Sequence, residues 1–110
     1  IGEYMFYDCT GLISIILPNG VTSIGPAAFS YRCCLEYVVL PSSLISIASR
    51  AFSGWGSIKE CYCHAIIPPS LDSHAWDSTA KDAKLYVPKG CVEAYEASDW
   101  GHYFTNIEEM

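Results

Sequence analysis

The residues of this chain best suited to chemistry are two cysteines and a histidine in the string Cys61-x-Cys63-His64. Thiolate and imidazole groups are the ligands that zinc prefers, and a thiol beside a base can act as a nucleophile. A closed zinc site needs four ligands, and no second Cys/His pair stands at a matching distance in the sequence. What this cluster can do therefore depends on the elements that carry it.

Those elements belong to an internal repeat. Twenty-three residues separate Ile1 from Ile24, and 23 separate Ile24 from Ile47. Each start is followed five residues later by an aromatic ring, and a looser fourth copy begins at Leu71. The rings are Phe6, Phe29 and Phe52, with Trp76 at the equivalent place of the fourth copy. Further along, the equivalent apolar positions hold Leu12, Leu35 and Ile58, then Ile15, Val38 and Cys61, then Leu17, Leu40 and Cys63.

Self-similarity at this period is the mark of a stacked array, in which each unit buries its apolar face against its neighbours. The pattern L-x-x-(I/V)-x-L places its last two apolar residues on one face of an extended strand. Cys61 and Cys63 therefore point inward as small buried hydrophobes, while His64 begins a turn. His74 and His102 fall in a bend and in the C-terminal segment. We expect no metal site, no catalytic residue and no cofactor.

The sequence does not decide whether the cysteines outside this string are buried thiols or form disulfides. Cys9, Cys33 and Cys34 lie close to the repeat positions that face the core. An even count of six cysteines also permits a disulfide framework, and cysteine usage alone does not fix the redox compartment.

Composition and charge argue against a disordered chain and against a nucleic-acid-binding protein. Hydrophobic residues make up 51% of the 110 residues and charged residues 16%, which favours an ordered core over disorder. Six Lys and Arg against twelve Asp and Glu give a net charge of −6, too acidic for the basic surface that nucleic acid requires. No apolar run approaches the ~20 residues of a transmembrane span.

The complete repeats resemble a known family. Ile24-Gly25-x-x-Ala28-Phe29-Ser30, followed by Leu35-x-x-Val38-x-Leu40-Pro41, is similar to the Treponema pallidum type of leucine-rich repeat found in BspA-like bacterial surface proteins. The resemblance covers about residues 1–88, and the segment that follows is similar to the closing segment of such proteins in gut Bacteroidetes. The chain departs from the family pattern where Arg32 and Trp55 replace Cys and where His64 replaces Pro.

The resemblance implies an α/β fold: a right-handed leucine-rich-repeat solenoid with one short parallel strand per repeat. We expect strands near residues 14–17, 37–40, 60–63 and 84–87, with the four aromatic rings stacked behind the sheet. The solenoid domain spans residues 1–90, and residues 91–110 form a C-terminal cap with a short helix over 91–99. Trp100, Phe104 and Ile107 are expected to plug the open end of the core.

The candidate site is the set of outward positions on the strands, which line up across the inner, concave surface of such an array. One row is Ser14, Tyr37, Glu60 and Lys84, and the next is Ile16, Val39, Tyr62 and Tyr86. Apolar and aromatic residues on a solvent-facing sheet often mark a contact site, and Tyr is favoured there. Cross-strand pairing that merely stabilises the sheet is an equal alternative.

The resemblance thus implies an exported protein, extracellular or at the bacterial surface, with its signal or anchor upstream. We expect a non-enzymatic module that binds a protein, such as a host or matrix protein, or a glycan, in adhesion or host interaction. A structural spacer without its own ligand is the alternative, and metal or thiol chemistry at Cys61, Cys63 and His64 comes third. Ile1 begins a repeat, so we expect an interior section of a longer array, whose open first coil permits an end-to-end dimer.

Overall fold

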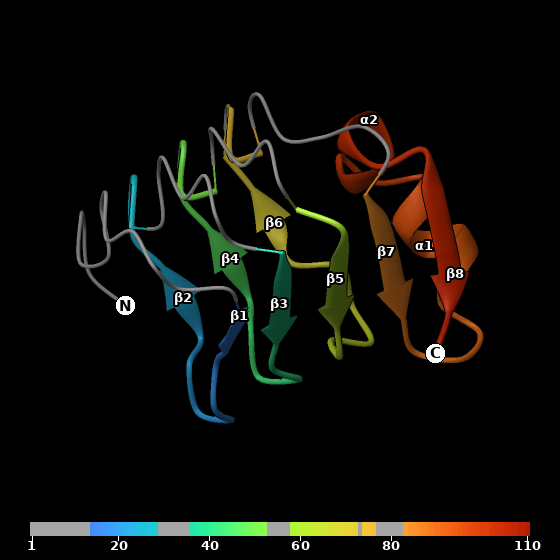
Figure 1. Ribbon diagram of the computed structural model, residues 1–110, viewed down its shortest axis with the longest axis horizontal. Coiled ribbons are helices and arrows are strands. Elements are labelled where there is room, and N and C mark those ends of the chain that lie inside the picture. Colours follow the sequence, from blue (N-terminus) through green and yellow to red (C-terminus); the bar gives the residue numbers. More distant parts are fainter. Residues whose placement is uncertain (1–13, 29–35, 53–57, 73, 77–82) are drawn as a thin grey trace.

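The computed structural model describes residues 14–28, 36–52, 58–72, 74–76 and 83–110 (Figure 1). Its main feature is a five-stranded sheet in the order β1-β3-β5-β7-β8, in which every neighbouring pair is parallel. The strands are β1 (Ser14–Ile16), β3 (Tyr37–Leu40), β5 (Glu60–Cys63), β7 (Lys84–Val87) and β8 (Asn106–Glu109). The predicted solenoid with one parallel strand per repeat is confirmed, although β1 ends one residue earlier than expected.

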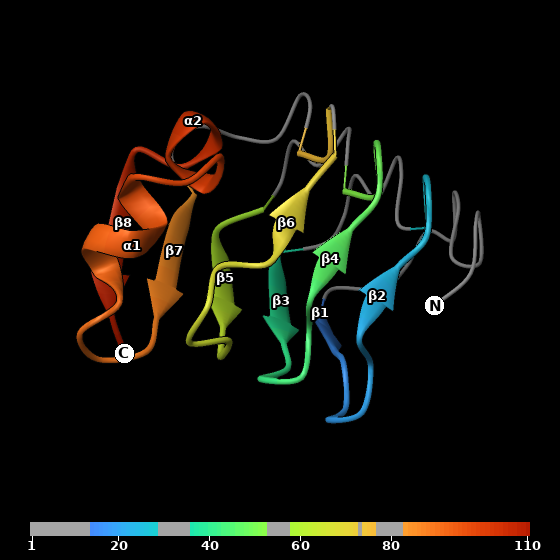
Figure 2. The same ribbon diagram turned by 180° about the vertical axis from the view of Figure 1, so that it is seen from behind.

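A second, smaller sheet runs along the segments that were expected only to connect the strands (Figure 2). It contains β2 (Ser23–Ile24), β4 (Ser46–Ile47) and β6 (Ser70–Leu71), paired in parallel in that order. The successive coils of the chain thus place one strand in each sheet. Because the described strands pair with strands of the neighbouring coils, the backbone hydrogen bonds hold the array together along its length.

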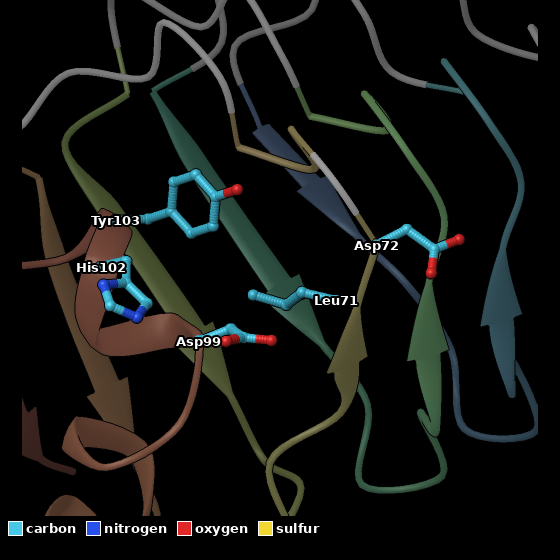
Figure 3. A pocket seen from close by; sticks show the side chains of 5 residues that line it. All are labelled: Leu71, Asp72, Asp99, His102 and Tyr103. Carbon is cyan, nitrogen blue, oxygen red and sulfur yellow. The ribbon is translucent and has the colours of Figure 1, made fainter.

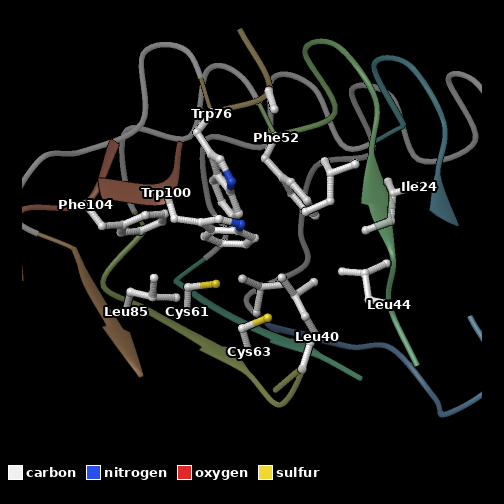
Figure 4. Close-up of a cluster of buried hydrophobic side chains, with 14 of the residues drawn as sticks. Ile24, Leu40, Leu44, Phe52, Cys61, Cys63, Trp76, Leu85, Trp100 and Phe104 are labelled. Carbon is white, nitrogen blue, oxygen red and sulfur yellow. The ribbon is translucent and has the colours of Figure 1, made fainter. Parts of the chain in front are cut away.

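The core lies between the two sheets (Figure 4). Val38 and Leu40 of β3 point inward from the large sheet and are fully buried, and Ile24 and Ile47 face them from the small sheet. At one end of this core the rings of Phe52 and Trp76 stack with centroids 4.3 Å apart. The expected stacking of repeat aromatics is confirmed for this pair, while Phe6 and Phe29 lie outside the described residues, as do Leu12 and Leu35.

The C-terminal region contains two helices in place of the single helix expected over residues 91–99. Helix α1 (Val92–Glu96) ends early, and α2 (Trp100–Tyr103) begins four residues later. Ser98 interrupts the helix because its hydroxyl donates to the Tyr95 carbonyl at 2.7 Å and accepts from the Trp100 N–H at 3.3 Å. Gly101 then passes so close to the Glu96 carbonyl that a Cβ would clash with it. The chain therefore turns back on itself here.

The strand β8 was not expected. It pairs with β7 in the register Lys84↔Asn106 and adds a fifth strand to a sheet for which about four were predicted. Trp100 and Phe104, at 0% and 2% exposure, fill the end of the core as expected, and Ile107 packs against it from β8. The boundary between solenoid and cap near residue 90 stays a prediction, since β8 continues the same sheet.

The helices of the described residues are short, and none has the length and apolar character that a membrane crossing requires. The open first coil, on which the expected dimer depends, falls in residues 1–13, outside the described part of the chain.

Candidate functional site

The outward positions of the large sheet form two straight rows, which we call the exposed face. The register joins each residue to its counterpart on the next strand. The first row is Ser14, Tyr37, Glu60 and Lys84, and the second is Ile16, Val39, Tyr62 and Tyr86. The structure thus brings together all eight residues that the repeat places there. Their role in binding stays a prediction.

The strand β8 lengthens both rows by one residue. Asn106 stands beside Lys84 in the first row, and Glu108 stands beside Tyr86 in the second. Neither residue was predicted from the sequence, because residues 106–109 lack the apolar pattern of the repeat. One signal was present: Asn106 follows Lys84 by 22 residues, close to the repeat period.

Two tyrosines dominate the part of the exposed face nearest the C-terminus. The rings of Tyr62 and Tyr86 stack with centroids 4.8 Å apart and planes 10° from parallel. Such an offset stack contributes on the order of 0.5 to 1.5 kcal/mol beyond area burial. Since the rings cover one another, one face of each is closed to any ligand.

Charged groups surround this stack. The pKa of Tyr62 is raised, first by burial and then by its hydrogen bond to Glu60, in which the phenol donates to the carboxylate. Lys84 Nζ lies 3.4 Å from Glu108 Oε2, and this partner raises the pKa of Lys84. Just before the first row, Lys59 pairs with Glu36 at 3.1 Å. These solvent-exposed ion pairs add little stability, because water screens them.

The part of the exposed face formed by β1 and β3 is different, because apolar side chains stand in solvent there. Ile16 is 73% exposed and Tyr37 is 39% exposed, while Val39 between them is half-buried. Burying the Ile16 side chain alone would contribute about 1.5 to 3 kcal/mol. This part of the face is therefore where a partner would gain most from the hydrophobic effect.

The cysteines point the other way, as predicted. Cys61 and Cys63 are fully buried and lie among the core side chains (Figure 4). The His64 side chain is exposed, so the three do not meet. Burial, and then the neighbouring Cys63, raises the pKa of the Cys61 thiol well above its ordinary value. A reactive thiolate or metal ligand is disfavoured by such surroundings.

Cys63 has a structural partner instead. Its sulfur lies 3.2 Å from the hydroxyl of Tyr95, and that hydroxyl donates to the Ala65 carbonyl at 2.6 Å. Through these buried contacts Tyr95 links helix α1 to the coil that contains Cys63 and Ala65. Within the described residues no three metal-ligating side chains are grouped, and Cys61, Cys63 and Cys91 are free thiols. Cys9, Cys33 and Cys34 lie outside the described residues.

A pocket of about 360 Å³ lies between the end of β6 and helix α2 (Figure 3). Its lining includes two carboxylates, Asp72 and Asp99, and the imidazole of His102. Figure 3 shows the Asp72 carboxylate directed away from His102, so the lining groups do not converge on one point. The arrangement therefore defines no catalytic or metal-binding constellation.

These features define a class: a solenoid of stacked coils whose side chains form a continuous outward face on one sheet and a closed core behind it. Residues 1–95 match the BspA type leucine rich repeat region, in six copies. The chain therefore belongs to the BspA-type leucine-rich repeat family. Leucine-rich repeat domains are generally non-enzymatic modules of protein interaction. No curated protein matches the chain.

Proposed function

We propose that this protein is a binding module that docks a protein partner on the exposed face, as part of an exported protein at a bacterial surface. The observation that carries the proposal is that Ile16, Tyr37, Tyr62 and Tyr86 all stand on the solvent side of one continuous sheet. Aromatic residues offer large contact area at low entropic cost. A role in adhesion or host interaction fits the surface location common among BspA-type repeats.

A protein suits this face better than a glycan. A sugar ring packs against an open aromatic face, but Tyr62 and Tyr86 each give one face to the other. Ile16 and Val39 offer apolar contact that suits side chains of a polypeptide.

The size of the face indicates how the partner must sit. Five strands about 4.8 Å apart and about 13 Å long give a surface on the order of 250 Å². A standard interface buries about 800 Å² on each partner. A stable partner must therefore also contact the turns that border the sheet or neighbouring coils.

The test replaces Tyr37, Tyr62 and Tyr86 together with Ser. The parent chain, immobilised, is screened against purified extracellular matrix and serum proteins, and Kd is measured for each protein that binds saturably. The triple variant should bind at least tenfold more weakly, because aromatic anchors carry much of the energy of an interface. Its Tm should stay close to that of the parent, since these side chains lie outside the core.

The matched control changes three exposed residues of the C-terminal helices, Glu93, Glu96 and His102, to Ser. This control should bind as the parent does. A spacer predicts no saturable binding by the parent at all, and equal binding by both triple variants would place the contact elsewhere. Display at the cell surface is tested separately, by protease digestion of intact cells, which should remove the chain.

A further inference from the structure

We propose that a hollow at the edge of the exposed face is a subsite for an acidic side chain, Asp or Glu, of the partner. This inference rests on the proposed function and adds a chemical preference to it. The hollow measures about 500 Å³ and is lined by residues at the ends of β1, β3 and β5 and in the turns that follow these strands. Figure 1 shows these turns beyond the arrowheads of the three strands. Its lining is Leu17, Pro18, Asn19, Val39, Pro41, Ser42 and His64.

The hollow is continuous with the exposed face. Val39 belongs to the second row of that face and also lines the hollow. A partner that packs on Ile16 and Val39 therefore has this hollow within reach of its next side chain. The hollow also borders the turns that a partner must contact to reach a stable interface.

The polar groups of the hollow are suited to donate hydrogen bonds. The Ser42 hydroxyl donates to Asn19 Oδ1 at 3.3 Å, which engages the amide oxygen and leaves the amide N–H groups as the donors that Asn19 can offer to a ligand. The exposed imidazole of His64 offers a further N–H. Among the described residues, no Asp or Glu lines the hollow, although the chain carries twelve of them. The lining thus offers two side-chain donors and no competing carboxylate, which is the chemistry that an anionic oxygen pair requires.

The same lining favours a carboxylate over a phosphate. A phosphate group carries close to two negative charges and is usually held by Arg or Lys. The described lining contains neither. A single negative charge on two oxygens needs less compensation, and amide and imidazole donors supply it.

The turns that shape the hollow are held rigidly to one another. Ser43 Oγ accepts from the Gly20 N–H at 2.9 Å and donates to the Val21 carbonyl at 2.8 Å, which joins the turns of two coils. Gly20 adopts a backbone φ of +104°, which residues other than glycine rarely adopt. Rigid turns hold the donors in place before a ligand arrives, so less entropy is lost on binding.

His64 is also the one departure from the repeat at this position. Pro18 and Pro41 occupy the equivalent place in the preceding coils and have neither a side-chain donor nor an N–H. His64 keeps the strand pairing through its own N–H, which donates to the Leu40 carbonyl at 3.1 Å. The fold therefore does not require an imidazole here, and its side chain is available to a ligand.

The experiment titrates the full chain, labelled with ¹⁵N, with N-acetyl-glutamate methylamide and follows the NMR signals. The Asn19 side-chain amide and the His64 backbone amide should shift saturably. The neutral analogue, N-acetyl-glutamine methylamide, should bind about tenfold more weakly, because the charge-assisted hydrogen bonds are lost. Inorganic phosphate should also bind more weakly than the glutamate probe.

Two variants test the assigned donors. Asn19→Asp keeps the acceptor for Ser42 but replaces the donating amide with a repelling carboxylate, and should weaken binding at least tenfold. His64→Ala should weaken it severalfold, whereas His102→Ala, a matched change of an exposed histidine in α2, should leave it unchanged. Folding of each variant is checked by the dispersion of the same spectra.

Equal affinity for the glutamate and glutamine probes would overturn the proposal, as would shifts centred on Lys59 or Lys84 in place of Asn19 and His64. Tighter binding of phosphate would also overturn it. The titration needs no protein partner, so its failure leaves docking on the exposed face intact. Conversely, the Tyr37/Tyr62/Tyr86→Ser variant should retain binding of the glutamate probe.

Discussion

The two sides of the large sheet are made by alternate residues of the same strands, yet they accept very different side chains. On the inner side the equivalent position holds Ile15, Val38, Cys61 and Leu85, all small to medium apolar groups. On the outer side the first row holds Ser14, Tyr37, Glu60 and Lys84: a hydroxyl, a phenol, a carboxylate and an ammonium group. Packing restricts the inner row to apolar groups, whereas the outer row carries a different group in each coil and is the side that a partner can reach.

The largest difference between the two sides should appear on truncating the core aromatic Trp76 to Ala. The ring stacks on Phe52 at 4.3 Å and meets the edge of Phe104 at 5.1 Å. Its loss leaves a cavity and should lower the free energy of unfolding by about 3 to 5 kcal/mol. Urea denaturation followed by circular dichroism measures this change. A loss below about 1 kcal/mol would mean that the core is not packed as described.

Removing a single buried hydroxyl should have the next largest effect. Tyr95→Phe deletes the donor to the Ala65 carbonyl and the partner of Cys63 while keeping the ring. The unfolding free energy should fall by about 1 to 3 kcal/mol, because a buried carbonyl is left without its hydrogen bond. The matched control, Tyr37→Phe on the exposed face, should change stability by less than about 0.5 kcal/mol. Similar losses of unfolding free energy in both variants would contradict the view that only the inner side of the sheet determines stability.

Alkaline pH should lower the free energy of unfolding through the buried thiols on the inner side of the sheet. Burial raises the pKa of the Cys61 and Cys63 thiols, so they stay protonated in the folded chain while the unfolded chain ionises. The folded chain then binds more protons, and stability is retained below about pH 8.5 and lost above it. Each thiol adds a slope of up to about 1.4 kcal/mol per pH unit.

The measurement is urea denaturation between about pH 8 and pH 9.5, a window below the ordinary pKa values of tyrosine and lysine, about 10, so that these groups stay largely protonated in both the folded and the unfolded chain. Cys61→Val restores the residue that Val38 supplies in the preceding coil and should flatten the slope. An equal slope in parent and variant would show that Cys61 does not stay protonated in the folded state.

The smallest effect is expected for the tyrosine stack on the exposed face. Tyr62→Ser, Tyr86→Ser and the double variant form a cycle whose coupling free energy should be about 0.5 to 1.5 kcal/mol, the range given above for such a stack. A coupling well above this range would favour the alternative in which the stack exists to stabilise the sheet. A small coupling together with lost partner binding would sharpen the contrast between the two sides.

The repeat predicted the parts of the fold that recur in every coil. Equivalent spacing alone was enough to place Tyr62 outside and Cys61 inside, because strand side chains alternate between faces. The register of β1, β3, β5 and β7 followed from the same spacing.

Features that occur once, or that depend on contacts between coils, could not be predicted. The strand β8 lacks the repeat pattern and pairs with β7 through the backbone. The two-residue strands of the small sheet are too short to show alternation in sequence. The hollow lies among the turns of three coils, and the hydrogen bond from Ser42 to Asn19 in its lining is not revealed by spacing. Helix α1 ends early because of Ser98, whose side chain competes with the helix for backbone groups.

The rows of the exposed face stay straight although the coils differ in length. Ser14, Tyr37 and Glu60 follow one another at 23 residues, Lys84 comes 24 residues later, and Asn106 follows after 22. The turns absorb the gain or loss of a residue, so the perimeter of a coil can change without shifting its neighbours sideways. An array built in this way can be lengthened, or its rim redecorated, one coil at a time, while the display of side chains already in place is left undisturbed.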